Sequence, residues 1–176
     1  MKTRDIVPSA LLTLLAVSLA PRGAAAQTPV QFSVVGGMSL PAGDLAGGAD
    51  LGFNLGVRAE GRPLSPGWAL RGDLSWDRYD GRGGVDGYSY LALAGNLVHH
   101  ETGGRLYEFG GLGIYNSRTS YTNTFGTSDT NLGVQLGLGF ALTRQAPNVF
   151  TEFGLTSAFT SGRSSVWFPV RLGLRF

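Results

Sequence analysis

The sequence predicts an all-β protein, an eight-stranded antiparallel up-and-down transmembrane β-barrel that follows a cleaved signal peptide. Three observations support this fold class. The chain begins with an export-like segment, continues with eight stretches in which apolar and polar residues alternate, and joins those stretches by alternately longer and shorter polar connections. Alternation with a period of two is the pattern of a strand that has two different environments on its two faces.

The amino-terminal segment has the parts of a secretory signal peptide. Lys2 and Arg4 precede a short apolar run, Ala10–Ala20, and small residues at 24–26 precede Gln27. The order of charged segment, apolar run and A-x-A site is typical of signal peptides, whereas a membrane-spanning helix needs about 20 apolar residues. A buried amphipathic helix is the alternative interpretation. We expect a signal peptide over residues 1–26 and one barrel domain over residues 27–176.

The charge of the remaining chain is balanced. Three of the 14 cations (Lys2, Arg4 and Arg22) and one of the 12 anions (Asp5) lie in the export segment, which leaves 11 of each. A balanced charge gives no indication of a nucleic-acid partner. Every remaining cation is arginine, which suits fixed sites with several hydrogen bonds. The chain has no cysteine, so disulfides do not stabilise it.

The first four alternating stretches cover Val30–Ser39, Leu51–Glu60, Gly67–Asp77 and Tyr88–His99. Their apolar faces carry Phe32, Val34, Met38, Phe53, Leu55, Val57, Ala59, Trp68, Leu70, Leu74, Trp76, Leu91, Leu93 and Leu97. Their opposite faces carry mainly charged, amide and hydroxyl groups. Each stretch is close to the roughly 9–11 residues that a tilted strand needs to cross a bilayer.

The last four stretches cover Leu106–Asn116, Asn131–Leu142, Val149–Thr156 and Val166–Phe176. The sixth is the most regular, because leucines alternate there with Gly133, Gln135 and Gly137. The fifth alternates poorly, and the sequence leaves its faces unassigned. The last stretch has the apolar row Phe168, Val170, Leu172, Leu174 and Phe176 on one side and Arg171 and Arg175 on the other.

The connections also alternate in length. Long polar loops are expected at Leu40–Asp50, Arg78–Gly87, Ser117–Thr130 and Ser157–Ser164, and shorter turns at Gly61–Pro66, His100–Arg105 and Thr143–Asn148. In an up-and-down barrel the long loops then share one end, and the short turns share the other with both termini. Long external loops with short periplasmic turns are typical of outer-membrane barrels.

A soluble secreted barrel is the main alternative, because alternation does not say which face is inside. Aromatic residues near the strand ends, such as Trp68 and Trp167, suit the interfacial belts of a membrane protein. Glycines such as Gly52, Gly137 and Gly173 lie on the polar side, where we expect them to leave room for charged side chains in a narrow lumen. We therefore predict that the leucines face lipid and the arginines face the lumen.

Four segments resemble the small eight-stranded outer-membrane β-barrel family, the OmpA-transmembrane, OmpX and OmpW type: Gly37–Asp44, Leu91–Val98, Gly110–Gly113 and Pro169–Phe176. The resemblance implies a bacterial outer-membrane location, with membrane lipids and lipopolysaccharide as partners. It also implies that the last strand is an assembly signal for the outer-membrane assembly machinery, carried by Phe168, Val170, Leu172, Leu174 and Phe176. The family is diverse, so the fold does not determine the activity.

The candidate site is the polar face of the strands. It carries four cations and four anions: Arg58, Arg71, Arg171, Arg175, Glu60, Asp73, Asp77 and Glu152. Unpaired charges in a narrow lumen are very costly, so we expect an ion-pair network that fills it. We expect Glu152 near Arg171 or Arg175, and Glu60 and Arg58 near Arg71. The network is either structural or the gate of a narrow pore.

These observations predict a non-enzymatic integral outer-membrane protein with a structural, envelope-integrity or surface-interaction role. A narrow channel for small or hydrophobic solutes is one alternative, and an outer-membrane lipid-modifying enzyme is another. His99 and His100 lie at the short-turn end, away from lipid A, and no G-x-S-x-G motif or metal-ligand spacing accompanies them. We expect no cofactor, no metal and no catalytic residues.

Overall fold

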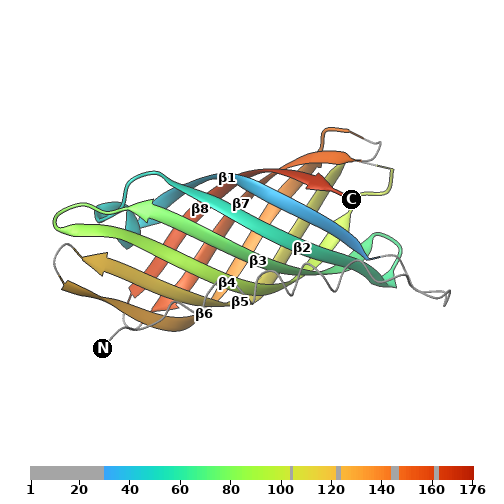
Figure 1. Cartoon of the computed structure of the whole chain (residues 1–176). Coiled ribbons are helices and arrows are strands. Elements are labelled where there is room, and N and C mark those ends of the chain that lie inside the picture. The colour runs from blue at the N-terminus through green and yellow to red at the C-terminus, as the bar shows by residue number, and fades with distance from the viewer. Residues whose placement is uncertain (1–29, 104, 122–123, 144–146, 161–162) are drawn as a thin grey trace, which may run out of the picture.

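The computed structural model describes residues 30–103, 105–121, 124–143, 147–160 and 163–176 as one closed antiparallel barrel (Figure 1). Each strand pairs with the next in the chain, and the first strand also pairs with the last. The strands are β1 (Gln31–Gly43), β2 (Gly52–Ser65), β3 (Trp68–Asp80), β4 (Val85–His100), β5 (Leu106–Tyr121), β6 (Thr124–Ala141), β7 (Asn148–Thr160) and β8 (Arg163–Arg175). The predicted fold class is confirmed, while the expected signal peptide lies outside the described residues.

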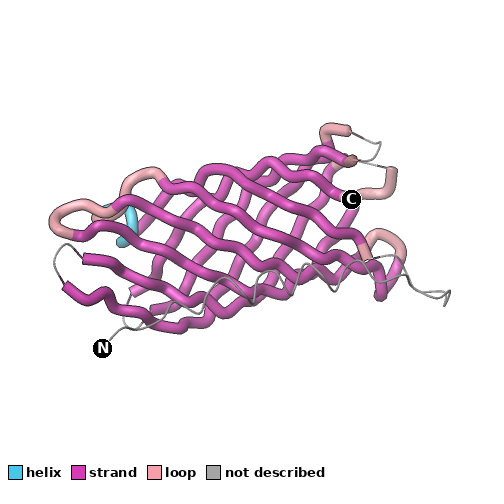
Figure 2. Tube along the Cα trace, viewed as in Figure 1, coloured by secondary structure: helices cyan, strands magenta, loops and turns pink. Residues whose placement is uncertain are grey.

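The two ends of the barrel differ. The carboxy-terminal end holds Phe176 and the connections β2–β3, β4–β5 and β6–β7. The other, here called the loop end, holds the β1–β2 connection with the short 3₁₀ helix η2 (Asp44–Gly47) and the turn between β3 and β4 (Figure 2). Among the described residues, no helix is long and apolar enough to cross a membrane.

The expected long loops at the loop end are largely strand instead. The β5–β6 ladder continues through Ser117↔Asp129 and Thr119↔Thr127 to Tyr121↔Thr124, so most of the expected loop 117–130 is a paired hairpin. The loops expected at 78–87 and 157–164 shorten in the same way, because β3, β4, β7 and β8 extend into them. The β-branched threonines of 117–130, such as Thr119 and Thr127, favour strands, and pairing satisfies the backbone groups of all three segments outside the membrane.

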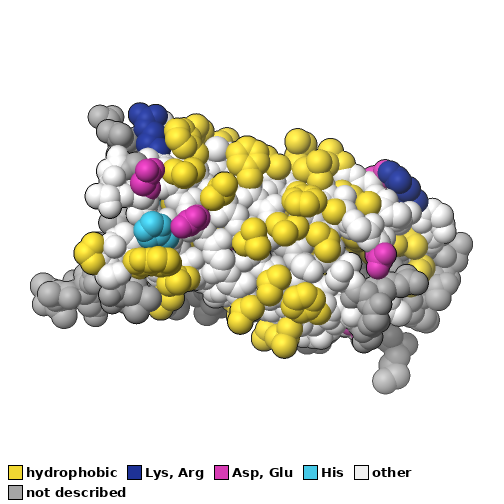
Figure 3. Space-filling view, turned by 180° about the vertical axis from the view of Figure 1, so that it is seen from behind, with side chains coloured by type: hydrophobic (Ala, Val, Ile, Leu, Met, Phe, Trp, Pro, Cys, Tyr) yellow, Lys and Arg dark blue, Asp and Glu magenta, His cyan; other side chains and the backbone are white. Residues whose placement is uncertain are grey.

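The faces of the barrel are oriented as a membrane protein requires. Leu136 is 53% exposed and Leu172 is 57% exposed on the outer surface, whereas Arg171 is only 5% exposed inside. Hydrophobic side chains spread over the middle of the outer surface, and charged side chains lie near its two ends (Figure 3). A soluble barrel would bury its leucines and solvate its arginines, so that alternative is wrong.

The structure also assigns the faces of β5. Tyr107, Phe109 and Tyr115 point into the lumen and are 3%, 6% and 1% exposed, while Leu112 and Ile114 point outward. The alternation was hard to interpret because both faces of this strand are apolar, aromatic inside and aliphatic outside.

The inward-facing glycines accommodate aromatic rings rather than charged groups, which corrects the sequence-based interpretation. A Cβ atom added to Gly137 would lie 2.5 Å from Cζ of Phe109, and one added to Gly139 or Gly173 would overlap Tyr107 or Phe150. Tyr107 and Phe109 are the direct cross-strand partners of Gly139 and Gly137. Each ring therefore lies flat over a neighbouring strand that has no side chain at that point.

Candidate functional site

The lumen consists of a charged layer between two apolar clusters. The loop-end cluster contains Leu45, Ala49, Tyr79, Tyr90, Ala92, Tyr115, Ala158 and Trp167. Trp167 is therefore inside the lumen, which corrects its expected place in an interfacial aromatic belt. The carboxy-terminal cluster contains Val35, Ala69, Val98, Tyr107, Phe109 and Phe150. Between them lie the buried groups Asn54, Arg58, Arg71, Asp73, Asp77, Asn96, Gln135, Glu152 and Arg171. The three arginines of this layer match its three carboxylates in number, so the layer is formally neutral.

Glu152 is the centre of the charged layer. It is 1% exposed, and its Oε1 atom accepts hydrogen bonds from Arg58, from Arg71 Nη1 at 3.1 Å and from the hydroxyl of Tyr107 at 2.7 Å. These partners come from β2, β3 and β5, while Glu152 comes from β7. One carboxylate thus connects four strands across the lumen.

Asp73 is the second carboxylate of the layer. Its Oδ1 atom lies 2.9 Å from Nε of Arg71, and Arg58 Nε lies 3.7 Å from its Oδ2. The amide of Gln135 donates to Asp73 at 3.3 Å and to Asn96 Oδ1 at 2.9 Å. Arg71 therefore lies between two carboxylates, and its guanidinium also stacks over the ring of Phe109, with Cζ 4.3 Å from the ring centroid.

A third group extends the layer toward the loop end. Arg171 Nε donates to Asn54 Oδ1 at 3.2 Å, and Asn54 donates to the hydroxyl of Ser39 at 3.2 Å. The Ser39 hydroxyl donates in turn to Asp77. Hydrogen bonds through Asn54 and Ser39 thus connect Arg171 to Asp77, and the two charged groups make no direct ion pair.

Glu60 and Arg175 lie below the charged layer, at the carboxy-terminal end, and the structure adds His100 to them. His100 Nε2 lies 2.8 Å from Glu60 Oε1, and Arg175 Nη2 lies 3.7 Å from Glu60 Oε2. From the sequence, His100 was expected in the turn that follows the fourth strand. Continuing the inward alternation of β4 from Asn96 through Val98 would have placed this side chain in the lumen.

Arg58 lies near Arg71 as expected, because both donate to Glu152 Oε1. The other expected neighbours are adjacent in strand register but form no ion pair with each other. Glu152 is opposite Arg171, and Glu60 is opposite Arg71, across adjacent strands. The ion pairs of Glu152 nevertheless reach Arg58 and Arg71 on distant strands. An eight-stranded barrel is narrow enough for a long arginine side chain to cross it, so partners are chosen across the lumen as well as along the sheet.

A folded-back segment covers the loop end of the lumen. Leu45 of η2 and Ala49 are 6% and 1% exposed and pack in the loop-end cluster. Backbone bonds tie this segment to the β3–β4 turn, from Arg82 N to Gly48 O and from Asp50 N to Asp80 O, both 2.9 Å. Arg82 Nε also donates to Asp50 Oδ1 at 2.9 Å, which holds the pKa of the Asp50 carboxyl below its usual value and raises the pKa of Arg82.

The histidines have no catalytic surroundings among the described residues. His99 Nδ1 lies 3.3 Å from Glu108 on the outer surface, and His100 contacts Glu60 inside. The described hydrogen bonds connect neither imidazole to a serine or threonine hydroxyl, which a nucleophilic mechanism would need. Within the same described ranges, no group of three or more histidine, cysteine, aspartate or glutamate residues could hold a metal ion.

Comparison with known proteins identifies the fold. The chain matches no protein-family model and no curated protein by sequence. Solved structures of outer-membrane proteins share the barrel. Neisserial surface protein A (NspA) is 15% identical with a TM-score of 0.57, over 83% of this chain and 95% of that one. Ail of Yersinia pestis, in complex with the heparin analogue sucrose octasulfate, is 19% identical with a TM-score of 0.52, over 84% and 99%.

The amino-terminal barrel domain of Pseudomonas aeruginosa OprF is 17% identical, with a TM-score of 0.52, over 85% of this chain and 98% of that one. The resemblance inferred from the sequence is therefore confirmed at the level of the fold. Such a fold, with an apolar outer surface and a charged interior, is that of an integral outer-membrane protein. The outer-membrane location follows from these features together.

Proposed function

We propose that this protein is a closed, non-conducting and non-enzymatic barrel that supports the integrity of the outer membrane and presents its loop end at the cell surface. One observation carries the proposal: the charged layer is neutral, buried, and sealed by an apolar cluster on each side. Trp167 and Phe150, one from each cluster, are each 1% exposed. A solute would have to displace both clusters to pass.

Planar-bilayer recording tests the closed lumen. The purified barrel is expected to give no steady openings, and Glu101→Gln, which changes an exposed turn carboxylate, should behave in the same way. Heat-modifiable gel mobility would show that each sample contains folded barrel. Steady openings of the unmodified protein would contradict the proposal.

A narrow gated pore is the second candidate, and the position of Arg71 favours it. Arg71 contacts both Asp73 and Glu152, so its guanidinium could exchange one carboxylate for the other. If this exchange opens a passage, Arg58→Ala and Glu152→Gln would change the size or frequency of openings. The same recordings therefore separate the two candidates.

The surface role is supported by the β5–β6 hairpin. Its outer part, residues 117–121 and 124–130, is strand, and it carries many hydroxyl groups and Tyr121. The sulfated ligand in the Ail structure does not carry over simply, because the loop end here mixes Asp44, Asp50, Asp80, Asp86 and Asp129 with Arg78, Arg82 and Arg118. Such a surface favours neutral polar partners, such as the sugars of lipopolysaccharide, over polyanions.

Cells with and without the protein test both roles. Loss of the protein is expected to increase sensitivity to detergents and bulky antibiotics, and a variant with the hairpin shortened at 119–127 should restore resistance without restoring surface binding. Unchanged sensitivity in the deletion strain would remove the envelope role.

The last strand is proposed to be the assembly signal. Phe168, Leu172 and Leu174 of β8 form an exposed apolar row that continues to Phe176, the residue after the strand. The backbone N–H of Phe176 donates to Phe32 O at 2.8 Å. Phe176→Ala should reduce the amount of assembled barrel in cells, while refolding into detergent should be unaffected. Equal loss in both measurements would indicate a stability effect instead.

A further inference from the structure

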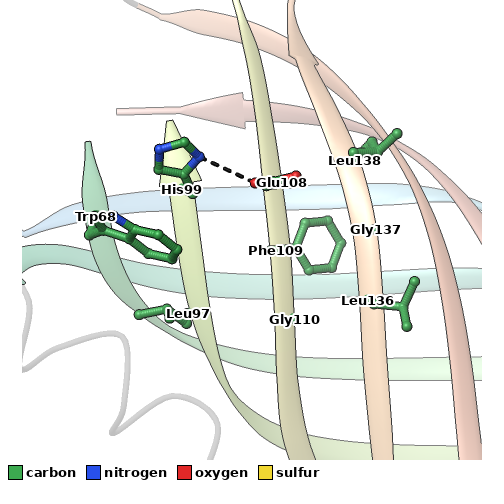
Figure 4. A pocket seen from close by; sticks show the side chains of 9 residues that line it. All are labelled: Trp68, Leu97, His99, Glu108, Phe109, Gly110, Leu136, Gly137 and Leu138. Atoms are coloured by element: carbon green, nitrogen blue, oxygen red, sulfur yellow. Dashed lines mark hydrogen bonds and ion pairs between the residues drawn. The ribbon is translucent and has the colours of Figure 1, made fainter. Parts of the chain in front are cut away.

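The outer surface carries one polar site within its apolar face, near the carboxy-terminal end. Trp68, His99 and Glu108 lie side by side on β3, β4 and β5, because Trp68 is opposite His99 and His99 is opposite Glu108. The ring centroids of Trp68 and His99 are 4.6 Å apart, and His99 Nδ1 lies 3.3 Å from Glu108 Oε1 (Figure 4). The two polar side chains remain open, at 40% and 64% exposure.

A groove adjoins this polar site. It has a volume of about 420 Å³ and is lined by the three residues above and by Leu97, Gly110, Leu136 and Leu138, among others. Gly110 lies between Leu97 and Leu136 in register, and its missing side chain leaves a hollow between the two leucines. A Cβ atom added to Gly110 would meet only the backbone O of Gln135, at 3.9 Å. The groove is therefore open to the membrane.

The position of these groups is unusual for a lipid-facing surface. Elsewhere on β3 to β6, the outward charged side chains Arg78, Asp80 and Arg118 lie toward the loop end of their strands. A carboxylate on the outer wall of a barrel costs free energy unless it has a partner, and such residues commonly mark a binding function. His99 contacts one carboxylate oxygen of Glu108, and 64% of the Glu108 side chain remains exposed.

We propose that this surface binds one phospholipid with a primary ammonium head group, of the phosphatidylethanolamine type, from the adjacent leaflet. The ammonium would bond to the Glu108 carboxylate. The phosphate would lie at Nε2 of His99. This nitrogen faces the β2–β3 turn, because a Cβ atom added to Gly67 in that turn would lie 3.7 Å from His99 Nε2. An acyl chain would occupy the hollow over Gly110, between Leu97 and Leu136. Trp68 would lie at the head-group level, where indole rings are favoured.

The charges of the site favour this occupant over other lipids. A choline head group cannot donate hydrogen bonds to a carboxylate, whereas a primary ammonium donates up to three. An anionic lipid without an amine would place its charge beside Glu108 and be repelled. The site therefore predicts selection by head group, with the groove supplying affinity from apolar contact.

Native mass spectrometry of the barrel released from nanodiscs tests the proposal. The discs would contain equal amounts of phosphatidylethanolamine, phosphatidylcholine and phosphatidylglycerol with identical acyl chains. The protein is expected to retain phosphatidylethanolamine over phosphatidylcholine by about three- to fivefold, as suits one interfacial charged contact. Glu108→Gln should abolish the preference, and Glu101→Gln, in the neighbouring turn, should preserve it.

A second variant tests the groove without changing charge. Gly110→Leu would fill the hollow and is expected to lower retention of the bound lipid. Gly72→Leu is the matched control, because a Cβ atom added to Gly72 meets nothing within 4 Å and lies outside the groove. Heat-modifiable mobility verifies folding of all four variants. The proposal would be overturned if the barrel retained the three lipids in equal amounts or preferred phosphatidylglycerol. It would also be overturned if Glu108→Gln left a preference for phosphatidylethanolamine unchanged.

Discussion

At the scale of single residues, the interior of this barrel depends on shared partners. Glu152 accepts hydrogen bonds from Arg58, Arg71 and Tyr107, and it is almost fully buried. Buried ion pairs contribute little net stability compared with apolar replacements, but removing one member leaves an uncompensated charge. The arrangement therefore makes each member of the network sensitive to substitution.

Glu152→Gln should lower the free energy of unfolding by about 3 kcal/mol, because two arginines lose their common carboxylate. Urea unfolding in lipid vesicles, followed by tryptophan fluorescence, measures the change. Glu101→Gln, at an exposed turn, should stay within about 0.5 kcal/mol of the unmodified protein. The double variant Glu152→Gln with Arg58→Gln should lose less free energy of unfolding than Glu152→Gln alone. An equal or larger loss in the double variant would show that the two charges act independently.

Glycine and aromatic residues form the second kind of interior contact. Gly139→Ala should lower the free energy of unfolding by about 1–3 kcal/mol, because the new methyl group overlaps the ring of Tyr107. Gly95→Ala on the outer surface, where a Cβ atom meets nothing within 4 Å, should be nearly neutral. The same urea titrations compare the two. Similar small effects at both positions would mean that the Tyr107 ring moves aside freely.

Among the elements, the segment that covers the loop end carries an exposed ion pair, Asp50–Arg82, in addition to its backbone bonds to the β3–β4 turn. Arg82 lowers the pKa of Asp50 from its usual 3.8. The ion pair therefore stabilises the covering segment at pH values above 3.8, and this stabilisation is lost as the pH falls through the lowered pKa of Asp50. Following the amide signals of Gly81 and Arg82 by NMR should give a midpoint below 3.8 in the unmodified protein. Arg82→Gln should raise the midpoint to about the ordinary aspartate value. If Arg82→Gln left the pH midpoint unchanged, the Asp50–Arg82 ion pair would be contradicted.

The elements also show how far the sequence can be interpreted. The part of β6 from Asn131 onward was predictable because leucines and glycines alternate regularly there. A similarly regular alternation in β8 predicted which face carries Arg171. The strands of the outer hairpins were not predictable, since residues such as Thr119 and Thr127 have no apolar face to reveal a period. The partners of Glu152 were also beyond the sequence, because register fixes neighbours along the sheet but not contacts across the lumen.

At the scale of the whole molecule, the barrel inverts the usual arrangement of a soluble protein. The charged groups of its central layer are enclosed and paired, while leucine and phenylalanine side chains cover most of the outside. This arrangement is stable only where hydrocarbon surrounds the outer wall, and the cost of a charge on that wall should therefore depend on depth. Strand β5 offers two leucines that report on depth from the same surface.

Leu112 lies in the middle of β5 and is 71% exposed, whereas Leu106 is the first residue of the strand and is 46% exposed. Leu112→Arg should lower the free energy of unfolding in vesicles by about 2–4 kcal/mol, because mid-strand residues lie near the bilayer midplane. Leu106→Arg should lower it by about 1 kcal/mol or less, because the strand end lies near the interface. Urea titration of both variants in the same vesicles gives the difference. In detergent micelles, which adapt to a charge, the difference should shrink. Equal small costs at both positions in vesicles would mean that water, rather than lipid, surrounds the outer wall.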